Sequence, residues 1–138
     1  MAQAERGPSI DARPLSPHLQ IYSPLINMVM SIMHRITGAA LYFGTLLVVG
    51  WLVAASTNAG NYVAFMGLLT HPIGQLVMIG YTWALIHHAL GGIRHLIWDT
   101  GRGFDLGTVN VLSWFTIIGS LLITGGIWVL IFRLRGLL

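Results

Sequence analysis

Four histidines and two arginines stand within or beside long apolar stretches of this 138-residue sequence. Ionisable side chains are costly inside a membrane, so those that occur there are candidates for function. A neutral imidazole binds metals, and a guanidinium binds carboxylates and other anionic oxygens. The candidates are His34, Arg35, His87, His88, Arg94 and His95.

The first group of candidates lies in the segment SIMHRITG, residues 31–38. Ser31, His34, Arg35 and Gly38 are spaced i, i+3, i+4 and i+7, which places them on one stripe of a helix. A hydroxyl, an imidazole and a guanidinium on one stripe must face protein rather than lipid.

The second group lies in HHALGGIRHLIWD, residues 87–99. His88 and His95 are seven residues apart and share a helix face, with Gly91 and Gly92 leaving an open surface between them where a flat macrocycle can lie. His87 is turned about 100° from His88, so the two neighbours cannot both serve one ligand site.

This pattern suits a b-type haem, since an imidazole can bind the iron and arginines nearer the surface can bind the propionates. The same residues also suit a second interpretation, because intramembrane histidines often join helices by hydrogen bonds and interfacial His–Arg pairs anchor helix ends. Spacing alone leaves both interpretations open, and it leaves His87 as an alternative ligand to His88.

Three apolar stretches must position these residues, at about 23–55, 72–98 and 108–132. Each exceeds the roughly 20 residues that span a bilayer as a helix. The predicted fold is therefore all-α, with three transmembrane helices forming part of a heteromeric bundle (residues 23–138), preceded by a polar segment at 1–22.

Local signals predict where these helices begin and end. We expect Ser23 to cap the first helix with Pro24 at its first position, and Pro72 to open the second. Turns are predicted at residues 56–61 (STNAGN) and 99–107 (DTGRGFDLG).

Composition supports a membrane protein and limits its chemistry. Hydrophobic residues make up 55% and charged residues 8%, with a mean hydropathy of +0.76, which is too apolar for a soluble chain of this length. The absence of cysteine excludes a disulfide framework, an iron–sulfur cluster or a thiolate zinc site held by this chain alone.

The arginines indicate orientation rather than nucleic-acid binding, because they are scattered along the chain. Five fall on the side of the N-terminus and two on the other side, so we expect residues 1–22 on the cytoplasmic or matrix surface. The third apolar stretch carries no ionisable group, which disfavours a channel or proton transporter. The five are Arg6, Arg13, Arg35, Arg94 and Arg102, and the two are Arg133 and Arg135.

Three segments resemble the cytochrome b556 (SdhC-type) membrane-anchor subunits of succinate:quinone oxidoreductase, respiratory complex II. They are residues 13–22 (RPLSPHLQIY), 31–38 and 87–99, in the order and separation typical of the family. Residues 22–27 lack a Trp that many relatives have there, so the outer wall of a quinone pocket does not follow from the resemblance.

The resemblance implies a role for each candidate residue. His88 would be the axial haem ligand supplied by this chain, with the second histidine coming from a sister anchor subunit. The haem propionates would lie near His34, Arg35, Arg94 and His95, and the ubiquinone head group would lie beside Ser31 and Arg35.

The function implied is that of a haem b-binding anchor in a succinate dehydrogenase that passes electrons to ubiquinone. We expect no catalytic residues for succinate oxidation here, because the chain lacks a dinucleotide-binding fingerprint and cysteines. The expected partners are the sister anchor, an iron–sulfur subunit and a flavoprotein, in a bacterial inner or mitochondrial inner membrane. The alternative is a cofactor-free structural anchor for a peripheral enzyme.

Overall fold

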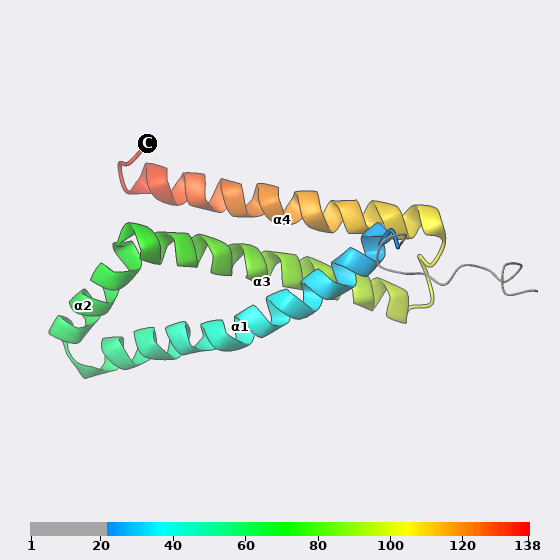
Figure 1. Ribbon diagram of the computed structural model, residues 1–138. Helices are drawn as coiled ribbons and strands as arrows, with labels where there is room; N and C mark the ends of the chain where they lie inside the picture. The colour runs from blue at the N-terminus through cyan, green and yellow to red at the C-terminus, as the bar shows by residue number, and fades with distance from the viewer. Residues whose placement is uncertain (1–21) are drawn as a thin grey trace, which may run out of the picture.

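A computed structural model describes residues 22–138, which form four α-helices and, within that range, no strand. Figure 1 shows them in chain order: α1 (Ile26–Thr57), α2 (Ala59–Thr70), α3 (Pro72–Asp99) and α4 (Leu106–Leu134). The polar segment predicted at 1–22 lies, except for Tyr22, outside the described residues.

Three of the helices, α1, α3 and α4, are long and apolar enough to cross a membrane. They contain 32, 28 and 29 residues, and a helix rises about 1.5 Å per residue. Each therefore exceeds the roughly 30 Å of hydrocarbon and must tilt or extend into the interface. The predicted all-α, three-span architecture is confirmed.

The predicted start of α1 is wrong by two residues. Leu25 rather than Ser23 precedes the helix, and its carbonyl accepts from the backbone amides of Met28 and Val29 at 3.0 and 3.2 Å. Leu25 itself is extended (φ −69°, ψ 152°), so Pro24 cannot be the first helical residue.

The turn predicted at residues 56–61 is also wrong, because only Asn58 lies outside the helices there. The hydroxyls of Ser56 and Thr57 donate to carbonyls one turn back, Val53 at 3.0 Å and Ala54 at 3.1 Å. These bonds let polar residues stay helical. The Asn58 side chain then caps α2 by accepting from the Asn61 amide at 2.9 Å.

The break before Pro72 and the turn after Asp99 follow the prediction. His71 caps α3 through its Nδ1, which accepts from the Ile73 amide at 3.3 Å. The connection from α3 to α4 contains Gly101 and Gly103, whose positive φ values of 77° and 76° favour glycine.

Asp105 caps α4 by accepting a hydrogen bond from the Thr108 amide at 2.8 Å. Its hydrogen bonds with Thr108 hold the pKa of the Asp105 carboxyl below its usual value. A carboxylate at this position also complements the helix dipole.

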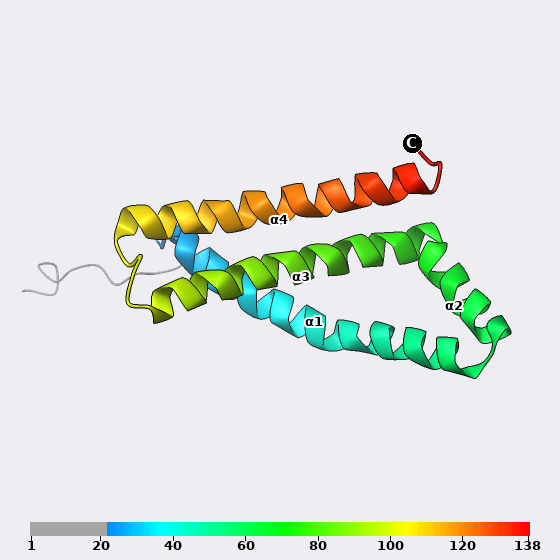
Figure 2. The same ribbon diagram turned by 180° about the vertical axis from the view of Figure 1, so that it is seen from behind.

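α3 lies between α1 and α4 over much of its length, as Figures 1 and 2 show from opposite sides. α1 begins beside the start of α4, crosses α3 and then diverges from it, and α2 returns the chain across the gap to α3 (Figure 1). Residues 26–40 of α1 are thus the part that meets the second half of α3.

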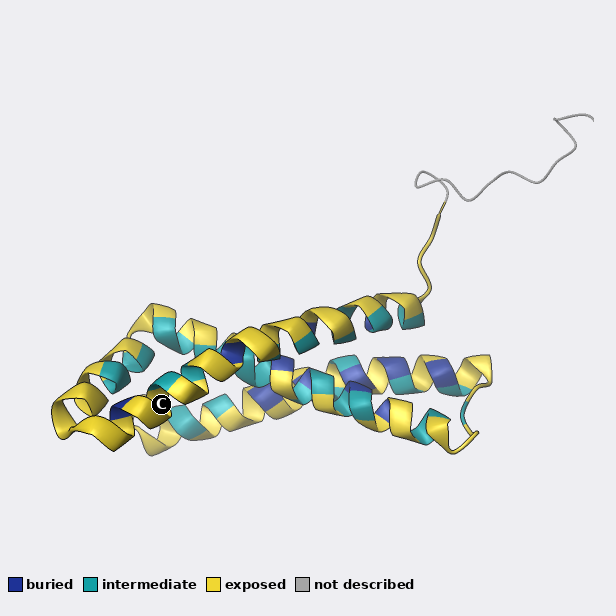
Figure 3. Ribbon diagram, turned by 90° about the horizontal axis from the view of Figure 1, so that it is seen from below, coloured by how far each residue is buried: buried dark blue, intermediate teal, exposed yellow. Residues whose placement is uncertain are grey.

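The polarity of the bundle is inverted relative to a soluble protein. Among the described residues, four buried side chains are apolar, whereas seven are polar or charged. Figure 3 shows exposed residues along the outer surfaces of the helices. Polar groups face the interior and apolar groups face outward, as expected where lipid is the solvent. The polar set is Thr37, His87, Arg94, Ser113, Thr116, Ser120 and Thr124.

Candidate functional site

Three of the predicted residues meet where α1 crosses α3. The rings of His34 and His88 stack with their centroids 3.9 Å apart and an angle of 6° between planes. The ring of His95 lies 5.2 Å from that of His34 at an angle of 52°. We call His34, His88 and His95 the histidine cluster.

The orientation of His88 is fixed by α1. Its Nδ1 lies 3.1 Å from the backbone carbonyl oxygen of His34 and 3.4 Å from the Thr37 hydroxyl. A carbonyl only accepts, and the Thr37 hydroxyl donates to the carbonyls of Met33 and His34. The proton of a neutral His88 ring therefore belongs on Nδ1, which leaves Nε2 with a free lone pair.

Two glycines allow the helices and rings to approach this closely. A Cβ atom on Gly38 would lie 3.0 Å from Cε1 of His88, and one on Gly91 would lie 2.5 Å from Nδ1 of His34. A Cβ on Gly92 would meet nothing within 4 Å. Gly38 and Gly91 thus serve helix contact, whereas Gly92 borders open space.

The other two polar side chains of the predicted stripe are Ser31, which is half-buried, and Arg35, which is exposed. No hydrogen bond to the side chain of Ser31 or Arg35 is found within residues 22–138. The structure therefore places them beside the histidine cluster without linking them to it.

Arg94 and His87 face α4 instead. The Nη1 of Arg94 donates to the Ser113 hydroxyl at 3.3 Å, and the guanidinium lies 5.0 Å from the centre of the Trp98 ring. Nδ1 of His87 lies 3.2 Å from the Ser120 hydroxyl oxygen. The predicted grouping of Arg94 with His95 does not correspond to a contact, since Arg94 is buried on another side of α3.

Sequence reasoning missed Thr37, Ser113 and Ser120, which hold the buried groups. One signal could have found the two serines: they are seven residues apart, as are His87 and Arg94. In two antiparallel helices, equal spacings of two turns allow both pairs to meet.

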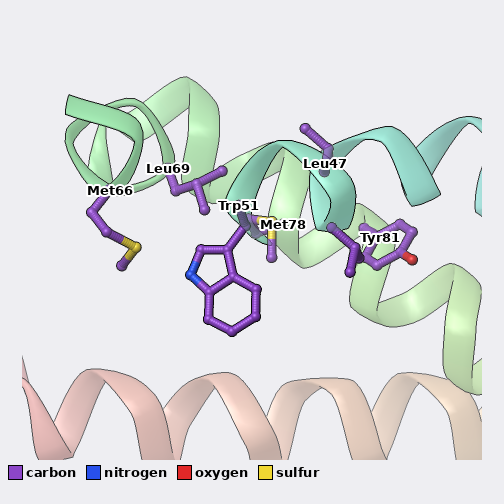
Figure 4. Close-up of a pocket in the computed structure, with 7 residues that line it drawn as sticks. Leu47, Trp51, Met66, Leu69, Met78 and Tyr81 are labelled. Carbon is purple, nitrogen blue, oxygen red and sulfur yellow. The ribbon is translucent and has the colours of Figure 1, made fainter. Parts of the chain in front are cut away.

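The larger hollows among the described residues lie elsewhere and are apolar. One of them, with a volume of about 250 Å³, lies between α1, α2 and α3, and Figure 4 shows Trp51 projecting into it. Trp51 is 17 residues beyond His34, about 25 Å along the helix, so polar chemistry is concentrated at the other end of the bundle. The cavity is lined by Leu47, Trp51, Met66, Leu69, Met78 and Tyr81.

Within the described residues, no group of three or more His, Asp or Glu side chains has the geometry to hold a metal ion. The histidine cluster stacks its rings rather than directing its nitrogens to one point. A metal bound here would therefore take fewer than three such ligands from residues 22–138.

Comparison with known proteins matches this arrangement to one family. Residues 9–127 match the family model of the succinate dehydrogenase/fumarate reductase transmembrane subunit. The chain is 41% identical to a succinate dehydrogenase cytochrome b556 subunit of Rickettsia conorii, over 85% of this chain and 91% of that one.

Two further relatives come from bacteria and from mitochondria. A cytochrome b556 subunit of Paracoccus denitrificans is 40% identical over 89% of this chain and 92% of its own. A mitochondrial cytochrome b560 subunit of Mus musculus is 33% identical over 83% of this chain and 69% of its own. With its three membrane-spanning helices, the chain belongs to the succinate dehydrogenase/fumarate reductase transmembrane subunit family, as a cytochrome b-type membrane anchor.

Proposed function

We propose that this chain binds one haem b together with a sister anchor subunit and helps to form the ubiquinone-reduction site of a succinate dehydrogenase. The observation that carries the proposal is the hydrogen bond between Nδ1 of His88 and the His34 carbonyl. A ligand histidine commonly donates its other ring proton to a backbone carbonyl, which fixes the tautomer and the ring orientation. His88 has this arrangement.

The neighbouring His87 is less suited to bind iron. It is 2% exposed, its Nδ1 contacts Ser120 on α4, and its Nε2 is enclosed without a partner in the described chain. His88 is only half-buried, so its Nε2 can be approached from outside the chain. This difference favours His88 as the ligand.

The surroundings of His88 also suit the rest of the macrocycle. Gly92, one turn from His88, leaves open space on that side of α3, and His95 is one further turn toward the membrane surface. His34, Arg35 and His95 supply cationic or hydrogen-bonding groups at the level expected for the propionates. Arg94, predicted for the same region, is directed toward Ser113 on α4 instead.

When bound, the haem would supply one-electron transfer at its iron, with a potential set by its ligands and surroundings. This chain would contribute the His88 Nε2 lone pair, the His34 carbonyl that orients that ring, and cations that balance the propionates. The second histidine ligand would come from the sister subunit, because one helix can reach only one side of the macrocycle.

Ser31 and Arg35 would form this chain's part of the quinone site. The hydroxyl of Ser31 can donate to a quinone carbonyl, and the exposed guanidinium of Arg35 can stabilise the negative charge that develops on that oxygen. Both residues are in the first three turns of α1, so the head group would lie near the interface and its isoprenoid tail in the hydrocarbon.

The other functions of the enzyme would reside in partner subunits. A flavoprotein would oxidise succinate, and an iron–sulfur subunit would pass the electrons to the quinone site. We place both on the cytoplasmic or matrix side, where the arginine distribution puts the N-terminus.

A reduced-minus-oxidised visible spectrum of the purified complex tests the proposal. A b-type band is expected in the wild type and should be lost or strongly reduced in His88→Ala. His71→Asn is the matched control, since His71 is exposed, lies at the opposite end of α3, and asparagine can still cap the helix.

Two results would contradict the proposal in different ways. An unchanged haem spectrum in His88→Ala would assign the ligand to another residue. A wild-type complex without b-type haem, prepared from haem-sufficient cells, would leave the cofactor-free anchor as the function.

A further inference from the structure

Two hydrogen bonds join α3 to α4 in matching register, in addition to a third in which the Trp128 indole donates to the Thr82 hydroxyl at 3.3 Å. Arg94 reaches Ser113 at 3.3 Å and His87 reaches Ser120 at 3.2 Å. Seven residues, or about two turns, separate the pair on each helix. We refer to His87, Arg94, Ser113 and Ser120 as the α3/α4 lock.

The direction of both hydrogen bonds follows from how the serines use their own protons. Ser113 donates to the Val109 carbonyl at 2.8 Å, and Ser120 donates to the Ile117 carbonyl at 2.9 Å. Each serine oxygen is thus left to accept from α3. Arg94 is necessarily a donor, and His87 must carry its proton on Nδ1.

Burial makes these bonds hard to exchange. His87 and Arg94 are each 2% exposed, and both serines are 0% exposed. A buried donor that loses its acceptor pays its full desolvation cost, with no water to replace the partner. Turning α3 about its axis would break both bonds together, so the lock opposes rotation.

The lock acts at the residue next to the proposed ligand. His87 and His88 are consecutive in α3, and their side chains leave the helix about 100° apart. Fixing the direction of His87 against α4 therefore fixes the direction of His88 on the face toward α1. A ligand must be held within a narrow angle to keep its coordination geometry.

We propose that the α3/α4 lock sets the rotation of α3 and thereby aims Nε2 of His88, which makes His87 and Arg94 positioning residues of the haem site. The inference rests on the proposed function. It gives α4 a part in the redox site, although α4 contributes no ligand to it.

The decisive variants remove the acceptors and leave every histidine in place. Ser113→Ala and Ser120→Ala, singly and combined, are compared with Thr116→Val in the purified complex. Thr116 is 1% exposed on the same side of α4, but its hydroxyl donates only to the Leu112 carbonyl of its own helix. All these changes remove one hydroxyl per site, and only the serine changes remove a bond to α3.

The readouts are haem content, the reduction midpoint and the low-field g value of the oxidised low-spin haem, which reports the orientation of the axial imidazoles. The combined serine variant should keep its haem while its g value and midpoint shift beyond the spread of replicate preparations. Thr116→Val should match the wild type. If the combined variant does not assemble, the single variants provide the same comparison with smaller shifts.

Substitutions of His87 provide a rescue test. His87→Asn keeps an amide near the position of Nδ1 and should retain the wild-type g value, whereas His87→Leu should shift it. Loss of haem in His87→Asn together with retention of haem in His88→Ala would show that His87 is itself the ligand and would overturn the inference.

The failure of this inference differs from the failure of the proposed function. If the combined serine variant has the g value and midpoint of the wild type, the positioning role of the lock is refuted, and the proposal that the chain binds haem is unaffected. A wild-type complex without b-type haem would refute both.

Discussion

Adjacent glycines in α3 give a sharp test of how closely α1 and α3 pack at the histidine cluster. We consider Gly91→Ala and Gly92→Ala, two substitutions that add the same methyl group one residue apart. A Cβ at position 91 would lie 2.5 Å from Nδ1 of His34, about 0.9 Å short of the 3.4 Å at which ordinary contact begins. A Cβ at position 92 meets no atom within 4 Å.

The magnitude follows from comparing the two variants. Both gain the helix propensity of alanine over glycine, about 1 kcal/mol, so this contribution cancels in the difference. Only Gly91→Ala must displace the His34 ring, which is already stacked on His88, and overpacking of this kind costs about 1–3 kcal/mol. Gly91→Ala should therefore be about 1–3 kcal/mol less stable than Gly92→Ala.

The assay is the free energy of unfolding of the purified complex in an SDS titration, with the visible haem spectrum recorded on the same samples. Gly38→Ala should fall between the two variants, since its Cβ would lie 3.0 Å from the His88 ring. Equal stability of Gly91→Ala and Gly92→Ala would refute the close approach of α1 and α3.

Two further predictions concern the quinone site and the start of α4. Ser31→Ala and Arg35→Ala should each lower quinone reductase activity at least tenfold, as expected for loss of a bond worth about 1.4 kcal/mol or more at the transition state. Succinate oxidation with an artificial acceptor should be retained in both variants. Equal loss of both activities would argue against a quinone role. Asp105→Ala should destabilise α4 because it removes the cap, and Asp105→Asn should preserve it. The pKa of Asp105 is lowered in the folded protein. The stability that its carboxylate contributes is therefore present above the unfolded pKa and is lost as the pH falls through the folded pKa. Thermal melting at pH 7 and at about pH 3 should show this loss in the wild type and not in Asp105→Asn.

The sequence predicted the long-range plan of the fold because strong local signals mark it. Pro72 and the glycines at 101 and 103 have backbone requirements that few other residues meet. The weaker signals failed: Ser23 resembles a cap but is followed by an extended Leu25, and Asn58 alone suffices for the corner predicted at 56–61.

The site was predictable to the extent that helical spacing determines it. Spacing placed His34 on one stripe and His88 with His95 on one face, and the structure shows that these two surfaces meet, with the His34 ring stacked on that of His88. The direction of Arg94 was not predictable, because it depends on the rotation of α3 against α4 and on serines that resemble ordinary span residues. Contacts between helices depend on tertiary packing, and the periodicity of a single helix does not predict which side chain of a neighbouring helix it will meet.

The inverted polarity of the bundle also bears on how the chain enters a membrane. α3 is the least apolar of the three long helices, and the acceptors for Nη1 of Arg94 and Nδ1 of His87 lie on α4. Ribosomal synthesis delivers α3 first, so these donors would face hydrocarbon without partners until α4 arrives. The six-residue connection at 100–105 keeps that interval short, and α3 and α4 are thus suited to partition into the bilayer together as a hairpin rather than one at a time.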